Sequence, residues 1–389
     1  MRILMLNHNV KGRGTYFRAY HFGRHLVKKG HQITLLTISP HSRCRFREEV
    51  DNGVRLVETP DLLWGKARSG WDLWDTLNRI LYIDRHSFDL VHAFDSRPAV
   101  ILPALSYRKR RGGKLVLDWA DWWGRGGTSY SRPYGLANHV IAPIETLFEE
   151  GFRNKADGAT VICSGLHQRL LSMGFPSKNV LRVPQGSNTD LIRPLDKWEA
   201  RAELGFPANI ALVGVLGGVF PGDAQLLGQA LEIVRNESPN CRLIAMGNHV
   251  YVSAFNSHGD SVIETGYLSY EKMSKYLACC DVLLLPLRNT VANNGRWPAK
   301  LNDYLSAGRP VVTCEVGDMT ELFTKHKVGL LSKDTPQDFA EKVLILLGNQ
   351  EMQEELGSNA RKLAEGQLAW EFLTERLDNF YARIRETTI

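Results

Sequence analysis

Lys300 and Asp303 are the two residues whose types and spacing most directly indicate chemistry. They stand three residues apart in a stretch that predicts a helix, so their side chains are expected to be neighbours on one face. A lysine ammonium can meet a phosphate as a point charge, and a carboxylate can accept two hydrogen bonds from sugar hydroxyls, including those of a ribose. An exposed ion pair without function is the alternative, because such pairs are common on helix surfaces.

The segment around this pair has an order typical of an anion site. A buried strand precedes a polar loop that holds Asn294, Gly295 and Arg296, and the loop leads into the helix. Pro298 suits the first helical turn, and Gly308 suits the left-handed residue just beyond the last turn. A helix N-terminus at the carboxyl end of a parallel strand offers free N–H groups and the positive end of the helix dipole. The segment therefore favours a phosphate site over the functionless ion pair.

Two further carboxylates, Asp118 and Asp121, follow a predicted strand at 115–117 in a loop rich in tryptophan and glycine. Loops at the carboxyl ends of parallel strands are where binding and catalytic residues gather. Either aspartate could orient or deprotonate a hydroxyl group. We expect this role to fall on Asp121 rather than on Asp118.

Glycines stand at turns where a ligand could approach the backbone closely. In the first half of the chain, Gly12, Arg13 and Gly14 lie between a predicted strand and a predicted helix. This loop lacks the third glycine of a dinucleotide fingerprint, and no acid directly follows the next strand, so hydride transfer is disfavoured. The second half repeats the arrangement of strand and glycine turn at Gly217, Gly218 and Gly247.

The elements that must position these residues are strands alternating with helices, in two separate series. Such alternation predicts two doubly wound, Rossmann-like α/β domains with parallel sheets. The chain of 389 residues is also longer than a domain with a single hydrophobic core normally is. We expect the first domain at 1–185 and the second at 186–365.

The composition is ordinary for a globular protein, with 43% hydrophobic residues and a net charge of +6. This mild positive charge suits acidic ligands or an anionic surface and does not call for nucleic acid. The six cysteines show no metal-ligand spacing and are typical of reduced thiols in a cytoplasmic protein. No signal peptide is predicted, and no apolar run approaches the roughly 20 residues of a membrane span.

Two features leave a peripheral membrane contact open. Trp64, Trp71 and Trp74 lie in a helix-like segment, where core packing is favoured and an acceptor-binding or membrane-interface loop is the alternative. The basic cluster at 108–114 suits the end of a helix, where cations favour the dipole, but it could also contact anionic lipid headgroups.

Six segments in order make the chain resemble the GT-B glycosyltransferases, in particular family 4 of retaining, nucleotide-sugar-dependent enzymes. Each segment is a weak signal alone, and their common order makes the resemblance specific. They are the glycine loop and helix end at 12–33, the strand at 156–164, the turn at 183–188, the strand at 281–286, the helix segment at 300–312 and the terminal helix containing Trp370 and Tyr381.

The chain departs from this family at three places. Gly295 stands where the first of two acids is usual, and only the second is kept, as Asp303. The segment at 214–222 contains no arginine or lysine, although the family clamps the donor diphosphate there. Ala120 replaces a common histidine next to Asp121.

The missing clamp shifts the expected diphosphate contacts onto other cations. Arg296, Lys300 and the helix N-terminus would neutralise the diphosphate, with help from Arg13. Cations are needed there because negative charge develops on the leaving group as the glycosidic bond breaks.

The resemblance implies transfer of a sugar from a nucleotide-diphosphate sugar to an acceptor hydroxyl, with retention, in a GT-B architecture of two domains facing across a cleft. It also implies a C-terminal helix, at 366–389, that crosses back to the first domain, and the use of neither a metal nor another cofactor. Asp303 would bind the ribose, Lys300 would serve both the phosphate and catalysis, and Tyr267 would lie near the base. The other residues expected at the donor are Gly12, Arg13, Gly14, Gly217, Gly218, Gly247, Asn294, Gly295 and Arg296, while Gly12, Gly14, Asp118 and Asp121 are expected to hold the acceptor.

The acceptor is expected to be a glycan, a lipid-linked group or a small molecule. Two other classes stay open because the basic clamp is missing. One is a degenerate scaffold or binding subunit, and the other is a nucleotide-sugar epimerase or a phosphorylase on the same architecture.

Overall fold

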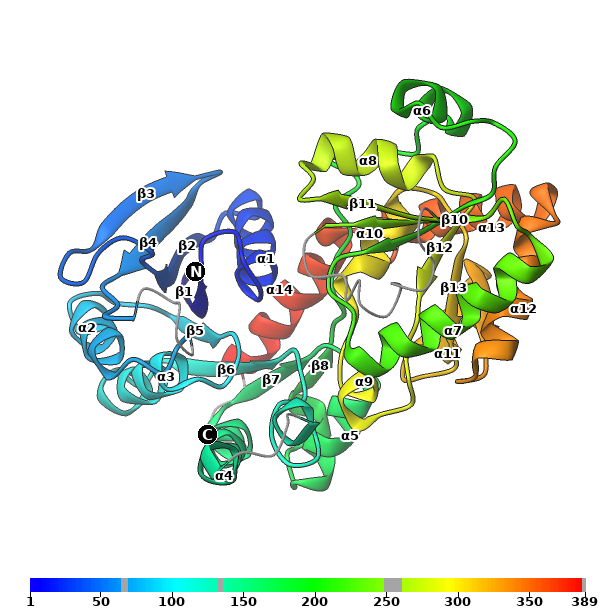
Figure 1. Ribbon diagram of the computed structural model, residues 1–389. Helices are drawn as coiled ribbons and strands as arrows, with labels where there is room; N and C mark the ends of the chain where they lie inside the picture. The colour runs from blue at the N-terminus through cyan, green and yellow to red at the C-terminus, as the bar shows by residue number, and fades with distance from the viewer. Residues whose placement is uncertain (64–68, 132–135, 248–260, 387–389) are drawn as a thin grey trace. The chain divides into compact units, whose positions relative to one another are not determined.

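A computed structural model describes residues 1–63, 69–131, 136–247 and 261–386, so the prediction made for Trp64 lies outside the described residues. The chain forms two compact units (Figure 1). The first comprises Met1–Pro184, Gly295–Trp297 and Trp370–Ile389, and the second comprises Gln185–Asn294 and Pro298–Ala369.

The first unit is built on an eight-stranded sheet with the order β3-β4-β2-β1-β5-β6-β7-β8. Neighbouring strands run parallel except β3 and β4, which are antiparallel. The strands are β1 (Arg2–Val10), β2 (Gln32–Ile38), β3 (Arg47–Asp51), β4 (Val54–Thr59), β5 (Leu90–Ala93), β6 (Lys114–Trp119), β7 (Gly158–Val161) and β8 (Val180–Arg182).

Strand β3 is the element of this sheet that sequence patterns did not predict. Its residues are mostly charged and largely exposed, so no apolar alternation marks it. The sequence signal for this strand is the Asn52-Gly53 pair that follows it. In the structure these two residues take positive φ angles of 48° and 78°. An Asn-Gly pair between two strands is typical of a tight hairpin.

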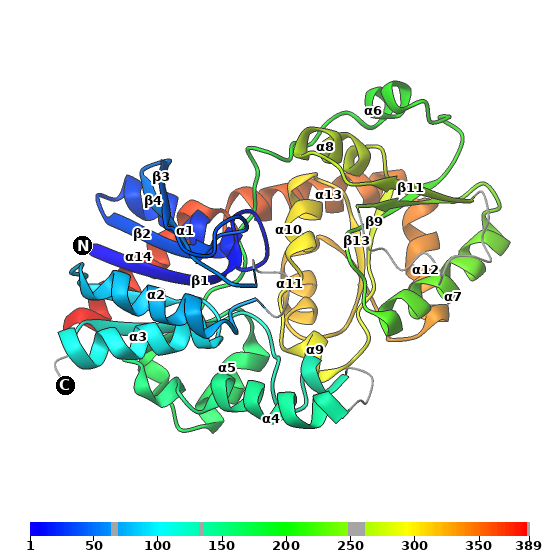
Figure 2. The same cartoon turned by 60° about the vertical axis from the view of Figure 1, so that its left-hand side comes forward.

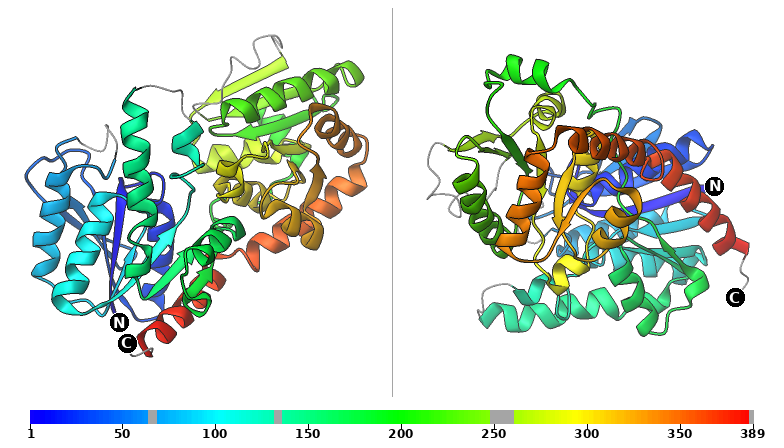
Figure 3. Two further views of the ribbon diagram at one scale, coloured as in Figure 1. Left: turned by 90° about the horizontal axis from the view of Figure 1, so that it is seen from below. Right: turned by 90° about the vertical axis from the view of Figure 1, so that its right-hand side faces the viewer.

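Helices cover both faces of the first sheet. Phe22 of α1 and Leu377 of α14 share one core with Ile3 and Met5 of β1, and α1 and α14 lie together in Figures 1 and 3. The other face carries α2 and α3, which lie side by side in Figure 2. The helices are α1 (Tyr16–Lys28), α2 (Leu73–Asp84), α3 (Pro98–Arg111), α4 (Leu136–Glu150), α5 (Ser164–Ser172) and α14 (Trp370–Glu386).

The second unit contains a six-stranded sheet with the order β11-β10-β9-β12-β13-β14, and its described strand pairs are parallel. Its strands are β9 (Leu212–Leu216), β10 (Arg242–Met246), β11 (Val262–Gly266), β12 (Val282–Leu285), β13 (Val311–Cys314) and β14 (Gly329–Ser332). Its helices are α6 (Lys197–Leu204), α7 (Pro221–Glu237), α8 (Tyr270–Ala278), α9 (Val291–Asn294), α10 (Ala299–Ser306), α11 (Met319–His326), α12 (Pro336–Leu347) and α13 (Gln350–Glu365).

Each sheet has a point where the strand order reverses direction. In the first sheet β1 lies between β2 and β5, and in the second sheet β9 lies between β10 and β12. Ligands of doubly wound sheets bind outside the carboxyl ends of the strands at such switch points. The prediction of two doubly wound α/β domains is confirmed, and each domain offers one such place for a site.

No helix within the described ranges combines the length and the apolar character that crossing a bilayer requires.

Candidate functional site

In the second unit, α10 carries the predicted pair Lys300 and Asp303 beside the switch point. Pro298 is the residue that caps the start of α10, and Gly308 follows its end with a φ of +64°. The hydroxyl of Tyr304 accepts a hydrogen bond from the Leu216 N–H at 2.7 Å and donates one to the Leu284 carbonyl at 3.2 Å. These bonds attach α10 to β9 and β12, so the helix is held at the reversal of the sheet.

Lys300 reaches from this helix to the glycine turn that follows β9. Its Nζ atom donates a hydrogen bond to the carbonyl oxygen of Gly218 at 2.6 Å. The structure thus brings together the predicted cation and the predicted glycine turn, which are more than eighty residues apart in the chain. The cation lies where the family's basic clamp is missing from the turn itself.

Three adjacent strands of the second sheet end in glycines with left-handed backbone. Gly217, Gly247 and Gly266 end β9, β10 and β11 with φ angles of +64°, +94° and +62°. The Gly217 N–H donates to the Met246 carbonyl at 2.7 Å, and the Gly247 N–H donates to the Gly266 carbonyl at 3.0 Å. Because L side chains rarely adopt this backbone, the edge stays bare and a flat ligand can approach the main chain. Gly217 and Gly247 are among the residues predicted from the sequence, and Gly266 is an addition from the structure.

Asp303 is a partly buried carboxyl whose ionisation is strongly perturbed. Burial raises its pKa to about 7, and the nearby Lys300 offsets only part of that rise. Tyr270 lies in the same electrostatic neighbourhood, since burial, Asp303 and Tyr267 together raise its pKa to about 12. Tyr267 follows Gly266 directly and leaves 82% of its surface exposed. An acid and an exposed aromatic ring therefore share this edge with the glycines.

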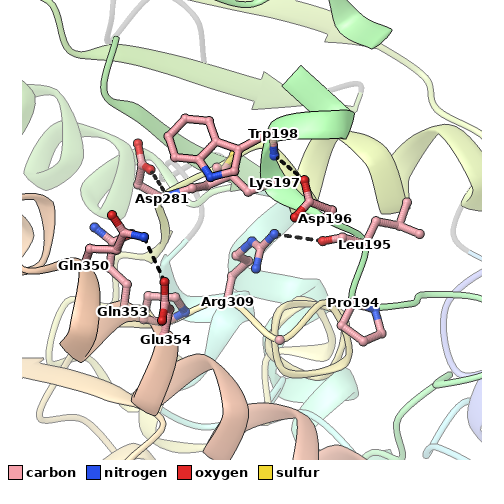
Figure 4. Close-up of a pocket in the computed structure, with 13 residues that line it drawn as sticks. Pro194, Leu195, Asp196, Lys197, Trp198, Asp281, Arg309, Gln350, Gln353 and Glu354 are labelled. Atoms are coloured by element: carbon pink, nitrogen blue, oxygen red, sulfur yellow. Dashed lines mark hydrogen bonds and ion pairs between the residues drawn. The ribbon is translucent and has the colours of Figure 1, made fainter. Parts of the chain in front are cut away.

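A separate hollow lies at the opposite, amino-terminal edge of the second sheet (Figure 4). It encloses about 330 Å³ and is lined by Asp281 and Pro310, which precede β12 and β13. Two of its cations already have protein partners, because Lys197 contacts Asp281 at 2.9 Å and Arg309 donates to the Leu195 carbonyl at 3.0 Å. Parallel sheets bind their ligands at the other edge, so this hollow is not the candidate site.

In the first unit, the glycine loop after β1 is held by a network of small polar side chains. Asn9 Oδ1 accepts hydrogen bonds from the Thr15 N–H at 2.9 Å and from its hydroxyl at 2.7 Å. Gly12 and Gly14 have φ angles of +78° and +53°, and a Cβ at Gly14 would lie 2.6 Å from Asn9 Oδ1. Arg13 is exposed between them. Contacts among residues of the loop therefore determine its shape. The contacts that these residues are predicted to make with a ligand stay predictions.

Asp118 does not lie in the loop where sequence analysis expected it. Strand β6 continues to Trp119, and the Asp118 side chain is fully buried inside the unit. The Arg18 guanidinium contacts it from Nε and Nη2, both at 3.1 Å, and the Thr160 hydroxyl also donates to it. Arg18 additionally binds the Val183 and Pro184 carbonyls at 2.9 Å. Asp118 is therefore an internal counter-ion that connects α1 to β6 and β7, and its burial makes it unavailable to an acceptor.

Asp121 is the loop carboxyl beyond the end of β6. Burial raises its pKa to about 7, the carboxylates of Asp95, Glu149 and Asp118 add to the rise, and Arg296 opposes it. Its backbone forms an antiparallel bridge with Arg296 of the segment Gly295–Trp297. A carboxyl with a pKa near neutrality can exchange a proton at physiological pH.

Glu149 of α4 holds the loop around Asp121 in place. Its carboxylate accepts hydrogen bonds from the Trp119 indole N–H and the Trp123 N–H, both at 2.8 Å, and from the Gly124 N–H. Burial raises the pKa of Glu149, and these donors offset part of that rise. Glu149 thus binds residues on both sides of Asp121 and stabilises the position of the loop.

Close packing explains why position 295 is a glycine. A Cβ at this position would lie 2.5 Å from the Cβ and 2.9 Å from the Cε3 of Trp122. The Trp122 ring is held in turn by the Arg169 guanidinium, 4.1 Å from the ring centroid, and by its own N–H bond to the Arg125 carbonyl at 2.9 Å. The acid usual at this position is thus replaced by close packing on an indole.

His8 and Asp95 form a pair that sequence analysis missed. His8 Nε2 lies 2.8 Å from Asp95 Oδ2, and both residues are nearly buried at the ends of β1 and β5, the switch point of the first sheet. Burial alone would raise the pKa of Asp95, but His8, Arg97 and the Ser96 N–H hold it well below its usual range. Asp95 has a φ of +78°, which is uncommon for a residue other than glycine. The available signal was a histidine and an acid, each just after a predicted buried strand.

Two family models match the chain along most of its length. The model described as "Glycosyl transferase 4-like domain" matches residues 13–186, and the model described as "Glycosyl transferases group 1" matches residues 209–349. Among curated relatives, spore coat protein SA of Bacillus subtilis is 24% identical over 232 residues, which are 54% of this chain and 61% of that protein. The uncharacterized glycosyltransferase MJ1178 of Methanocaldococcus jannaschii is 28% identical over 111 residues, which are 27% of this chain and 29% of that protein.

Solved structures resemble the chain over nearly its whole length. Sucrose-phosphate synthase of Thermosynechococcus elongatus superimposes with a TM-score of 0.76 at 16% identity, covering 98% of both chains. Anabaena Alr3699/HepE, solved with UDP and glucose, superimposes with a TM-score of 0.72 at 16% identity, covering 98% of this chain and 100% of that one. At these identities the likeness establishes the shared fold.

Proposed function

The chain belongs to the group 1 glycosyl transferases of the GT-B fold, and from this premise we propose that it moves a sugar from a nucleotide-diphosphate sugar to an acceptor hydroxyl. In the reaction the bond between the anomeric carbon and the diphosphate oxygen breaks, and the nucleoside diphosphate leaves with the electron pair. The acceptor oxygen bonds to the anomeric carbon and gives up its proton. We propose retention of the anomeric configuration.

The observation that carries this proposal is the hydrogen bond from Lys300 to the Gly218 carbonyl at the bare glycine edge. The donor diphosphate would lie beside this ammonium, which neutralises charge on the leaving group. Asp303 would accept the ribose hydroxyls, and Tyr267 would lie against the base. The backbone at Gly217 and Gly247 would permit close contact with the nucleotide. The related Anabaena protein was solved with UDP-glucose, which supports a donor of this class.

The acceptor would bind to the first unit, at the ends of β1, β5 and β6. Asp121 would accept a hydrogen bond from the reacting hydroxyl and orient it, and its near-neutral pKa suits partial or full proton transfer. His8 and Asp95 would line the same edge. The expected contacts of Gly12, Arg13, Gly14, Asn294, Gly295 and Arg296 with the donor stay predictions.

We further propose that the acceptor is a glycan, a lipid-linked group or a small molecule and that the chain contacts the membrane peripherally. Transfer would need neither a metal ion nor another cofactor, because Lys300 would supply the cation for the leaving group. Rates that stay the same in buffer with and without EDTA would support metal independence, and a loss restored by Mg²⁺ would contradict it.

A panel of nucleotide-diphosphate sugars tests the function. A donor that binds only the folded chain raises its melting temperature by mass action, so the matching sugar and base should stand out. Release of nucleoside diphosphate from that donor should then be measured with and without acceptor alcohols. A scaffold would release none, an epimerase would alter the sugar without an acceptor, and either result would overturn the proposal.

A further inference from the structure

Helix α2 of the first unit carries a charged pair inward and three leucines outward. Asp75 and Arg79 are fully buried, whereas Leu73, Leu77 and Leu81 expose 72%, 47% and 49% of their surfaces. The three leucines are spaced four residues apart and therefore form one stripe. A surface helix normally shows the reverse arrangement, with its apolar stripe against the core.

The buried charges determine how α2 is oriented. Arg79 Nε contacts Asp75 Oδ1 at 2.8 Å, and the Thr59 hydroxyl also donates to that oxygen. Arg79 Nη1 donates to the Asn7 carbonyl at 2.7 Å and to the Ala99 carbonyl at 3.2 Å. Turning the helix to bury its leucines would break this network and leave a buried charge uncompensated. The exposure of the leucine stripe is therefore built into the fold.

Helix α4 repeats the same inversion. Glu145 and Glu149 face inward, where Glu145 accepts from Arg97 at 3.0 Å and from the Ser129 hydroxyl. Val140, Ile144 and Leu147 face outward and expose 64%, 40% and 57% of their surfaces. Spacings of four and three residues place these side chains in a second stripe.

The two stripes lie on the side of the first sheet that α3 also covers. Tyr82 and Ile83 of α2 and Phe148 of α4 pack into one core with α3, and the Trp71 and Phe148 rings lie 5.5 Å apart. We call Leu73, Leu77, Leu81, Val140, Ile144 and Leu147 the outer aliphatic face. A monomer rarely exposes so many aliphatic side chains in ordered stripes without a partner.

Cations border the outer aliphatic face. The last turn of α3 contains Arg108, Lys109, Arg110 and Arg111, of which the last three are exposed. Arg85 is exposed just beyond α2. The neighbouring acid Asp84 is paired with Arg110. Aliphatic side chains suit an apolar layer, and exposed arginine and lysine suit negative groups at the surface of that layer.

We propose that the outer aliphatic face docks on a bilayer containing anionic lipids, with the leucines of α2 in the headgroup boundary and the α3 cations on lipid phosphates. Trp74, 39% exposed beside Leu73, suits the same interface. This inference rests on the proposed function in one respect, because docking would bring the first unit to a membrane-bound acceptor. The exposed cations beside the leucine stripe favour an anionic bilayer over a protein partner.

Vesicle sedimentation with the full chain tests the proposal. Vesicles of phosphatidylcholine alone are compared with vesicles that also contain about 30% phosphatidylglycerol, and the wild type should bind only the second kind. The Leu77→Gln, Leu81→Gln double variant should bind the anionic vesicles about tenfold more weakly, because it loses the inserted side chains. Lys109→Gln with Arg111→Gln should weaken binding by about the same factor, and by less at high salt.

Leu191→Gln is the matched control, because Leu191 in the second unit is as exposed as Leu77, at 47%. It should bind vesicles like the wild type. Melting temperatures of all variants should stay close to that of the wild type, since the altered side chains are exposed. Vesicle binding by the leucine variant at wild-type strength would overturn the proposal, and so would a change from dimer to monomer in that variant, which would assign the face to a second copy.

The donor reaction separates this inference from the proposed function. With a water-soluble acceptor, the leucine variant should release nucleoside diphosphate at the wild-type rate, because no residue of the outer aliphatic face belongs to the site. If neither protein turns over a donor while vesicle binding still depends on the leucines, the proposed function fails and the docking surface stands. Lost turnover with unchanged vesicle binding in the leucine variant would overturn the docking surface.

Discussion

The Lys300 ammonium and the Gly218 carbonyl oxygen lie 2.6 Å apart, and this bond joins the start of α10 to the turn after β9. It brings a cation to a glycine turn that contains none of its own. Under the proposed function, this lysine would take the place of the family's diphosphate clamp from a neighbouring helix at the same edge of the sheet.

Lys300→Ala should reduce kcat/KM for the donor by about a hundredfold, a size typical of losing one charged stabiliser of a leaving group. Steady-state nucleotide release measures this change. Lys342→Ala, which removes a partly exposed lysine of α12 that pairs with Asp338, is the control and should have no effect. A kcat/KM for Lys300→Ala within twofold of the wild type would exclude Lys300 from the diphosphate site.

Donor affinity should depend on the ionisation of Asp303. Its pKa is about 7, and only the carboxylate can accept two ribose hydroxyl bonds. Calorimetry should therefore give a dissociation constant about tenfold higher at pH 6 than at pH 8. Asp303→Asn should bind weakly at both pH values, and a flat pH dependence in the wild type would contradict the assignment.

The same carboxyl should affect stability with a defined sign. Because its folded pKa is raised above the ordinary 3.8, its contribution to stability is fully present below pH 4 and is lost as the pH rises through 7. Asp303→Asn should therefore raise the free energy of unfolding by about 1–2 kcal/mol at pH 8, a value reduced for partial solvent exposure. Denaturant melts should show this gain disappearing toward pH 4. A gain of equal size at both pH values would have another cause.

The rate of transfer should follow the ionisation of Asp121. Burial and neighbouring acids raise its pKa to about 7, so kcat/KM should rise with pH and level off above that value. Asp121→Asn should lose this step and react about a hundredfold more slowly. Asp190→Asn, an exposed acid of the second unit, should keep the wild-type profile. If Asp121→Asn keeps the rise of kcat/KM with pH, the ionisation of another group causes that rise.

Gly295→Glu restores the acid usual in the family, but it should not restore a site. The new Cβ would meet Trp122 at 2.5 Å, so the variant should lose about 1–3 kcal/mol of stability from overpacking. Combining it with Trp122→Ala should recover part of that loss, which denaturant melts can measure. Full stability of the single variant would mean that Trp122 moves aside freely.

The local pattern of the sequence determined the elements around α10 and the placement of its two charged residues. Apolar runs predicted the buried strands, Gly308 marked the end of the helix with its left-handed backbone, and the spacing of Lys300 and Asp303 placed both near the same loop. These features depend on contacts between residues close in the chain, which a sequence displays directly. The charged strand β3 was missed because its signal lay in the Asn52-Gly53 turn and not in its own residues.

Only the tertiary structure decided which acidic side chains are available to bind a ligand. Asp118 and Asp121 look equivalent in sequence, but Arg18, a hundred residues away, binds the first, while the second lies beyond the strand end. The pairs His8–Asp95 and Gly295–Trp122 likewise join segments that no local pattern connects. The physical reason is that ionisation and packing depend on burial and on distant partners, and these are determined only when the parallel strands bring their carboxyl ends together.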